Sequence, residues 1–189
     1  MILNIPNVFT LARLVLIPLF VGVLYFPYHW LAPPDASLTA VGIFLLAALT
    51  DAVDGFVARR WNQTTAFGAF LDPVVDKLMV MAALIVLVDL QRIPSVFAIV
   101  IIGREIAISA LREWMAQLGK SANVAVSTLG KVKTSAQMLA IPFLLYDKSF
   151  FGMFSCHWVG LVAIFIATIL TLGSMVYYLR IAVATGALD

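Results

Sequence analysis

Two apolar stretches, each carrying a pair of aspartates, decide the fold of this chain. They read LTAVGIFLLAALTDAVDGFVARR over residues 38–60 and FGAFLDPVVDKLMVMAALIVLVD over residues 67–89. About 20 apolar residues are enough for an α-helix to cross the hydrocarbon core of a membrane, and both stretches exceed that length. Because only residues 61–66 separate them, the sequence predicts two antiparallel membrane-spanning helices joined by a short loop.

The composition of the whole chain fits a membrane protein. Of its 189 residues, 63% are hydrophobic and 12% are charged, with a net charge of +2, whereas soluble domains have roughly 45–50% apolar and about 25% charged residues. These values exclude a disordered chain and a nucleic-acid-binding protein with a basic face. The single cysteine, Cys156, excludes both an internal disulfide framework and a cysteine-based metal cluster.

Four further apolar stretches extend the pattern along the chain. The predicted spans cover residues 8–27, 38–60, 67–89, 94–116, 134–149 and 156–181. We therefore expect an all-α integral membrane protein whose six transmembrane helices form one domain over residues 1–189. The first stretch is interpreted as a retained helix and not as a cleaved signal sequence, because Arg13 interrupts it and nothing basic precedes it.

The distribution of Lys and Arg predicts the orientation of these spans. When the spans alternate between the two sides of the membrane, Arg92 and Lys148 fall on one side and the other ten of the 12 basic residues fall on the side of the termini. Cytoplasmic loops carry the excess of Lys and Arg in membrane proteins. We therefore expect both termini in the cytoplasm.

Four aspartates lie inside the predicted spans, where a charged side chain is costly unless it has a partner. At about 100° per residue, Asp51 and Asp54 share one face of their helix, and Asp72 and Asp76 share one face of theirs. Asp51 and Asp76 are each nine residues from an end of the loop region that joins the helices. An antiparallel pair therefore brings the four carboxylates to one level near the cytoplasmic boundary of the membrane.

Four clustered carboxylates stay ionised only if cations neutralise them. The only basic residues interleaved with them are Arg59 and Lys77. Two divalent cations would cancel the four negative charges, so we expect two such ions, and oxygen ligands favour Mg²⁺, Mn²⁺ or Ca²⁺. Two such ions form the usual clamp on a phosphoryl group that undergoes in-line displacement. Aspartates inside a membrane also fit the ion pathway of a divalent-cation carrier, which is the alternative from another functional class.

The spacing of these residues resembles the signature of the CDP-alcohol phosphotransferase family. The segment from Asp51 to Asp76 follows the pattern D-x-x-D-G-x-x-A-R, eight residues, then G-x-x-x-D-x-x-x-D at every position. The resemblance implies a six-helix enzyme of the bacterial cytoplasmic membrane that works as a homodimer among membrane lipids. It implies two Mg²⁺ or Mn²⁺ ions held by the four aspartates, with Asp76 as the general base. It also implies CDP-diacylglycerol as the donor substrate, bound by Gly55, Ala58, Arg59, Gly68, Asn7 and Thr10.

The acceptor substrate is predicted from the sequence outside this motif. Asn4–Asn7, Arg104–Ile106 and Gly130–Thr134 are similar to the bacterial branch of the family that uses sn-glycerol 3-phosphate. That acceptor is an anion, and we expect its phosphate to be bound by the cations Arg104, Arg112, Lys131 and Lys133. Glu105 is interpreted as a structural partner of the neighbouring arginines. The motif leaves open another acceptor, such as inositol phosphate, serine or phosphatidylglycerol.

Overall fold

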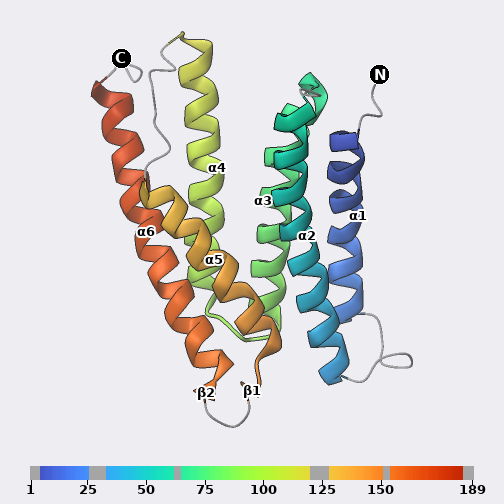
Figure 1. Ribbon diagram of the computed structural model, residues 1–189. Coiled ribbons are helices and arrows are strands. Elements are labelled where there is room, and N and C mark those ends of the chain that lie inside the picture. The colour runs from blue at the N-terminus through green and yellow to red at the C-terminus, as the bar shows by residue number, and fades with distance from the viewer. Residues whose placement is uncertain (1–4, 26–32, 62–64, 120–127, 151–153, 185–189) are drawn as a thin grey trace. The chain divides into compact units, whose positions relative to one another are not determined.

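The described part of the chain is almost entirely α-helical, as predicted (Figure 1). The computed structural model describes the backbone of residues 5–25, 33–61, 65–119, 128–150 and 154–184. Within these ranges, the side chains left undescribed are those of residues 5, 6, 33–35, 52–61, 66, 69, 128–131, 149, 150 and 154. The elements are α1 (Ile5–Tyr25), α2 (Pro33–Trp61), α3 (Ala66–Asp89), α4 (Ser95–Gln117), α5 (Thr128–Tyr146), β1 (Ser149–Phe150), β2 (Phe154–Ser155) and α6 (Cys156–Ala184).

The boundaries of α5 differ most from the prediction, which was residues 134–149. The helix ends at Tyr146 because Asp147 has a φ of +50°, a left-handed conformation in which an α-helix cannot continue. At its other end, α5 already begins at Thr128, so Lys133 lies inside the helix and not in the loop before it. Similarly, α2 begins at Pro33, five residues before the predicted span, because proline is well tolerated in the first turn of a helix.

The chain forms two compact units, and the first consists of residues 1–89 and 145–147. In this unit α1 packs against both α2 and α3. Phe20 of α1 and Phe44 of α2 are almost fully buried, with ring centroids 6.5 Å apart. At one end of the unit, the Tyr25 hydroxyl donates a 2.6 Å hydrogen bond to Oδ2 of Asp89, which ties the last turn of α1 to the end of α3.

The second unit consists of residues 90–144 and 148–189. Here α4 packs against α6, and the rings of Phe97 and Phe165 meet edge to face with centroids 6.4 Å apart. The guanidinium of Arg92 donates a 3.2 Å hydrogen bond to the carbonyl of Leu144, near the end of α5. The short antiparallel pair β1–β2 connects α5 to α6.

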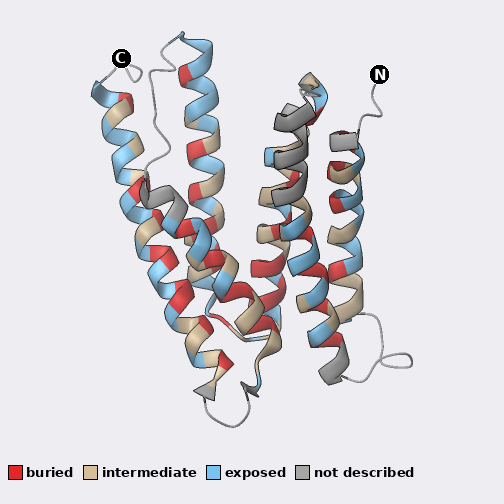
Figure 2. Cartoon of the chain, in the orientation of Figure 1, coloured by how far each residue is buried: buried red, intermediate tan, exposed pale blue. Residues whose placement is uncertain are grey.

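Exposed residues lie along every helix (Figure 2), and many of them are large and apolar, as expected for helices that face lipid. On α6, Trp158 is 69% exposed, and Val162, Phe165 and Ile169 follow it at helical spacing with more than half of their surface exposed. Among the described residues, two helical segments are long and apolar enough to cross a membrane by length and mean hydropathy, Asn7–Tyr25 and Cys156–Ala184.

One close contact in the second unit gives a test of its packing. A Cβ atom added at Gly160 of α6 would lie 2.6 Å from Cγ and 3.1 Å from the backbone nitrogen of Leu144. Since a backbone atom cannot move aside easily, we expect Gly160→Ala to lower the free energy of unfolding by about 1–2 kcal/mol, near the lower end of typical overpacking costs. The matched control is Gly173→Ala on the same helix, where an added Cβ meets nothing within 4 Å. Thermal unfolding in detergent measures both, and equal midpoints would contradict the described packing of α5 on α6.

Candidate functional site

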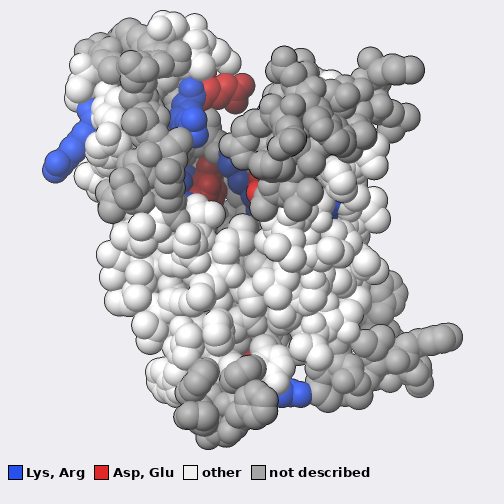
Figure 3. Space-filling model, viewed as in Figure 1, with Lys and Arg blue, Asp and Glu red and all other residues white. Residues whose placement is uncertain are grey.

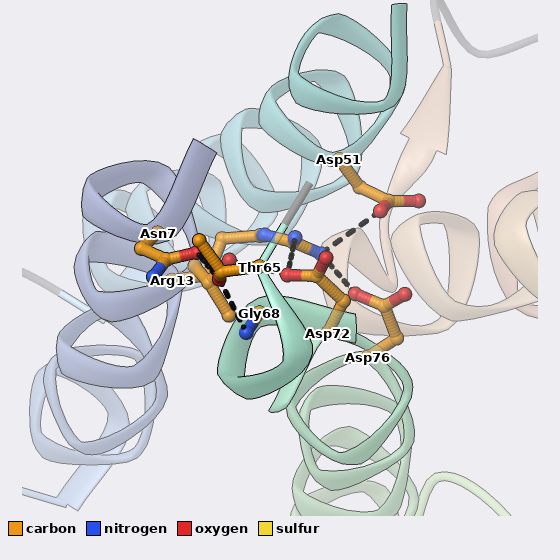
Figure 4. A network of polar contacts seen from close by, with 8 residues as sticks. Asn7, Arg13, Asp51, Thr65, Gly68, Asp72 and Asp76 are labelled. Carbon is orange, nitrogen blue, oxygen red and sulfur yellow. Dashed lines mark hydrogen bonds and ion pairs between the residues drawn. The ribbon is translucent and has the colours of Figure 1, made fainter. Parts of the chain in front are cut away.

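An arginine lies among three of the predicted aspartates (Figure 4). Nη1 of Arg13 lies 3.0 Å from Oδ1 of Asp51 and makes a closer contact with Oδ1 of Asp76. Its Nη2 lies 3.5 Å from Oδ1 of Asp72. These side chains come from α1, α2 and α3, so the first unit of the chain gathers them from three helices. We refer to Asp51, Asp72 and Asp76 as the acidic cluster.

The arginine and the three aspartates of this ion-pair network differ in solvent exposure. The Arg13 side chain is only 3% exposed, whereas those of Asp51, Asp72 and Asp76 are 48%, 40% and 38% exposed. Three carboxylates against one guanidinium leave two negative charges among the described side chains. The cluster is therefore an anionic site whose carboxylates are open on one side and whose counter-charge is buried on the other.

A second polar network joins the first turns of α1 to the start of α3. The hydroxyl of Thr10 donates to Oδ1 of Asp72. One turn earlier on α1, the side-chain oxygen of the buried Asn7 accepts a 2.9 Å hydrogen bond from the Thr65 hydroxyl. The same hydroxyl accepts a 3.0 Å hydrogen bond from the backbone N–H of Gly68. A Cβ atom at Gly68 would collide with the Asn7 side chain. A side chain at position 68 would therefore displace the Asn7 side chain from its hydrogen bond with Thr65.

The structure brings together all six of the predicted donor-site residues whose side chains or contacts it describes. Asp51, Asp72 and Asp76 share one guanidinium, and Asn7, Thr10 and Gly68 lie in the network beside them. For the other four predicted residues the structure describes only the backbone, within α2: Asp54, Gly55, Ala58 and Arg59.

Arg13 was not predicted to lie beside the aspartates. Arg59 and Lys77 were the basic residues expected near them, because both are close to them in sequence. The buried partner comes from α1 instead. The signal that could have found it was its position: an arginine well inside an apolar span needs an anionic partner at membrane depth.

The donor chemistry of the acidic cluster fits a hard divalent cation. Its ligands are carboxylate oxygens, which Mg²⁺ and Mn²⁺ prefer, and each carboxylate is partly open. Within the described residues, however, no three acidic, histidine or cysteine side chains are arranged so that they could hold one metal ion. The guanidinium of Arg13 contacts all three carboxylates at the point where they approach one another (Figure 4).

A separate basic cluster lies in the second unit. The guanidinium of Arg104 is 3.0 Å from Oε1 of Glu105, donates a 2.8 Å hydrogen bond to the Ser174 hydroxyl, and stacks over the ring of Tyr178 at 5.6 Å. Lys133 of α5 contacts the same Glu105 oxygen. Both cations are more than nine-tenths buried. Two cations against one carboxylate give this cluster, Arg104, Glu105 and Lys133, a net positive charge.

Some buried polar atoms in the basic cluster, or one helical turn from its contacts, have no hydrogen-bond partner among the described residues. Within the described part of the chain, no hydrogen-bond partner is present for the buried Nε of Arg104 or for Nε2 of Gln137, which lies one turn after Lys133 on α5. The same is true of the buried hydroxyl of Thr171, one turn before Ser174 on α6. Buried donors without a partner are rare in proteins and call for an explanation such as a ligand.

Of the four cations predicted to bind an acceptor phosphate, the structure brings two together. Arg104 and Lys133 meet at Glu105, which confirms the expected pairing of Glu105 with Arg104 and adds a lysine to it. Arg112 is exposed two turns further along α4, and the side chain of Lys131 is outside the described residues. Ser174 and Tyr178 were not among the predicted residues, because their contacts depend on how α6 packs against α4.

Comparison with known proteins gives a consistent result. A family model described as CDP-alcohol phosphatidyltransferase matches residues 3–173. The chain is similar to proteins named CDP-diacylglycerol–glycerol-3-phosphate 3-phosphatidyltransferase. The identity is 49% for that of Salmonella paratyphi A, 49% for that of Escherichia coli K12 and 50% for that of Shigella flexneri, in each case over 95% of this chain and 94% of the relative.

Proposed function

Because the chain belongs to the CDP-alcohol phosphatidyltransferase family, we propose that it transfers the phosphatidyl group of CDP-diacylglycerol to sn-glycerol 3-phosphate. The products are phosphatidylglycerophosphate and CMP. The observation that carries the proposal is the near-50% identity, over almost the whole chain, to proteins named for this reaction. The proposal treats residues 1–189 as one catalytic domain.

The aspartates are proposed to bind the donor through divalent cations. Asp51, Asp54, Asp72 and Asp76 would hold two Mg²⁺ or Mn²⁺ ions, which supply positive charge to the diphosphate of CDP-diacylglycerol and stabilise charge as it develops. The excess negative charge of the acidic cluster and its open carboxylates support this role. The proposed lining of the donor site is completed by Gly55, Ala58, Arg59, Gly68, Asn7 and Thr10.

Asp76 is proposed as the general base of the transfer. Its carboxylate takes the proton of the 1-hydroxyl of glycerol 3-phosphate, and that oxygen forms a bond to the phosphorus that carries diacylglycerol. The bond from this phosphorus to the CMP oxygen breaks, and CMP leaves with the electron pair. The free pKa of a carboxyl group lies far below that of an alcohol, so Asp76 alone is a weak base, and the nearby positive charge helps by lowering the pKa of the hydroxyl.

The basic cluster is proposed to bind the phosphate of the acceptor. Arg104 offers a planar fork of donors and Lys133 a point charge, and Glu105 fixes both side chains by ion pairs. The buried Nε of Arg104 has no hydrogen-bond partner among the described residues, and neither has Nε2 of Gln137, one turn from Lys133; both observations support a polar ligand. Arg112 and Lys131 are proposed as outer contacts of the same anion.

For the arrangement in the membrane, we propose the topology predicted from the sequence. Six spans are proposed to cross the bacterial cytoplasmic membrane, with both termini in the cytoplasm, and the homodimer is retained from the family resemblance. On the face shown in Figure 3, a broad band of the described surface of each unit carries no Lys, Arg, Asp or Glu side chain. This band and the exposed apolar side chains of α6 support helices that contact lipid.

An acceptor assay tests the proposed function directly. Purified full-length protein in detergent is given CDP-diacylglycerol, Mg²⁺ and one acceptor at a time, and CMP release is measured. We expect release with glycerol 3-phosphate and none with inositol phosphate, serine or phosphatidylglycerol. Release with another acceptor alone would assign the chain to a different branch of the family. No release with any acceptor, together with Mg²⁺ flux into vesicles that contain the protein, would favour the cation carrier.

A further inference from the structure

Arg13 is the buried counter-charge of the acidic cluster, and this position has a consequence for cation binding. We propose that Arg13 offsets part of the negative charge of the cluster in the metal-free protein and that divalent cations displace its guanidinium from the carboxylates when they bind. The inference rests on the proposed function, because it takes Asp51, Asp72 and Asp76 as cation ligands.

The contacts of Arg13 show why the two kinds of cation compete. One guanidinium contacts the Oδ1 atoms of all three carboxylates. Around it, no three of the described acidic side chains are arranged to share a metal ion. The guanidinium therefore occupies the space between the three carboxylates that a shared cation would need.

Electrostatic interactions also favour replacement of the guanidinium by divalent cations. Without metal, three carboxylates on neighbouring helices repel one another, and the positive charge of Arg13 offsets this repulsion. The Arg13 side chain is 3% exposed, so that charge is poorly solvated. A divalent cation beside it repels the guanidinium, and the repulsion is strong because the site is partly buried. When two divalent cations neutralise four aspartates, the charge of Arg13 is left over. It then adds to the attraction of the site for the diphosphate of the donor.

Removal of the Arg13 charge therefore affects the metal-free and metal-bound protein in opposite directions. The metal-free protein loses the counter-charge of the acidic cluster and becomes less stable. Cation binding no longer has to break the contacts of a guanidinium and becomes tighter. A residue that merely held the carboxylates in place for the metal would, when removed, weaken cation binding instead.

Binding of Mn²⁺ to Arg13→Gln tests this inference without use of turnover. Full-length protein in detergent is freed of metal with EDTA and dialysed, and free Mn²⁺ is followed by electron paramagnetic resonance during titration. We expect the Kd of Arg13→Gln for Mn²⁺ to fall about tenfold or more relative to wild type, since one charge interaction in a partly buried site is easily worth that factor. The matched control is Arg180→Gln, an exposed arginine near the end of α6, whose Kd should equal that of wild type.

Thermal unfolding gives a second readout on the same samples. In EDTA, Arg13→Gln should unfold at a lower temperature than wild type, and saturating Mn²⁺ should raise its midpoint by more than it raises that of wild type. If Arg13→Gln cannot be purified, Arg13→Lys keeps the charge but loses the planar fork. Its Kd should then lie below that of wild type by a smaller factor.

The outcomes separate this inference from the proposed function when CMP release is measured in parallel. An unchanged or higher Kd in Arg13→Gln, with wild type active, overturns displacement of Arg13 and leaves the proposed function intact. A lower Kd with no CMP release by wild type for any acceptor supports the displacement and overturns the proposed function. Absence of Mn²⁺ binding by both wild type and Arg13→Gln overturns the inference together with the proposed cation site.

Discussion

Replacement of Asp76 by asparagine is expected to reduce kcat for CMP release by about a thousandfold, within the usual range for loss of a general base. The amide has nearly the same shape as the carboxylate but cannot accept the proton of the acceptor hydroxyl. The KM for CDP-diacylglycerol should change by only a few-fold, because Asp51 and Asp72 still contribute carboxylates to the donor site. The measurement is steady-state CMP release at saturating glycerol 3-phosphate.

Two controls separate the base from the other roles of a carboxylate. Asp89→Asn makes the same substitution on α3, where Asp89 accepts a hydrogen bond from Tyr25, and should keep wild-type turnover. Asp51→Asn removes a proposed cation ligand, so raising the Mg²⁺ concentration should restore much of its activity, whereas it should not restore that of Asp76→Asn. If Asp76→Asn retains activity near that of wild type, Asp76 is not the base.

The second large effect is expected at Arg104. Substitution with glutamine should raise the KM for glycerol 3-phosphate by about 10- to 100-fold, because hydrogen bonds to a charged group contribute roughly 1.5–3 kcal/mol and each 1.4 kcal/mol corresponds to a factor of about ten. The KM for CDP-diacylglycerol should stay within a few-fold of wild type. Arg104→Lys should fall between, since it keeps the charge and loses the fork.

Arg112 provides an internal comparison for this prediction. Its side chain is exposed, whereas that of Arg104 is buried against Glu105, Ser174 and Tyr178. Charge interactions at an exposed site are weaker, so Arg112→Gln should change the acceptor KM much less than Arg104→Gln. Because Lys133 is the one ion-pair partner of Glu105 left among the described residues in Arg104→Gln, thermal unfolding must show that the variant is folded. An equal rise in both KM values, or none, would contradict the assignment of Arg104 to the acceptor.

The sequence alone was sufficient for the helical class and for the order of the helices. Apolar stretches longer than about 20 residues can satisfy their backbone hydrogen bonds only within a helix when they lie in a membrane. The fixed spacing from Asp51 to Asp76 also predicted the family, which the comparisons confirm. These features are local: they depend on residue type and on distance along one or two neighbouring helices.

Helix ends were predicted less well, again for a local reason that composition does not reveal. Asp147 adopts a positive φ and ends α5 three residues before the predicted boundary. At the other end, the residues before Lys133 are polar enough to read as a loop, yet they continue the helix from Thr128. Hydropathy detects where a chain is apolar, and a helix can extend beyond that point.

The sequence by itself determined the family of the chain and which two helices present the aspartates. Only the tertiary structure decided the partners: Arg13 for the acidic cluster, and Lys133 with Ser174 and Tyr178 around Arg104 and Glu105. Periodicity indicates which face of a helix is polar, but it does not specify how far that helix is rotated or shifted against another helix distant in sequence. Those two quantities follow from side-chain packing across the helix interfaces, and they determine which charges meet.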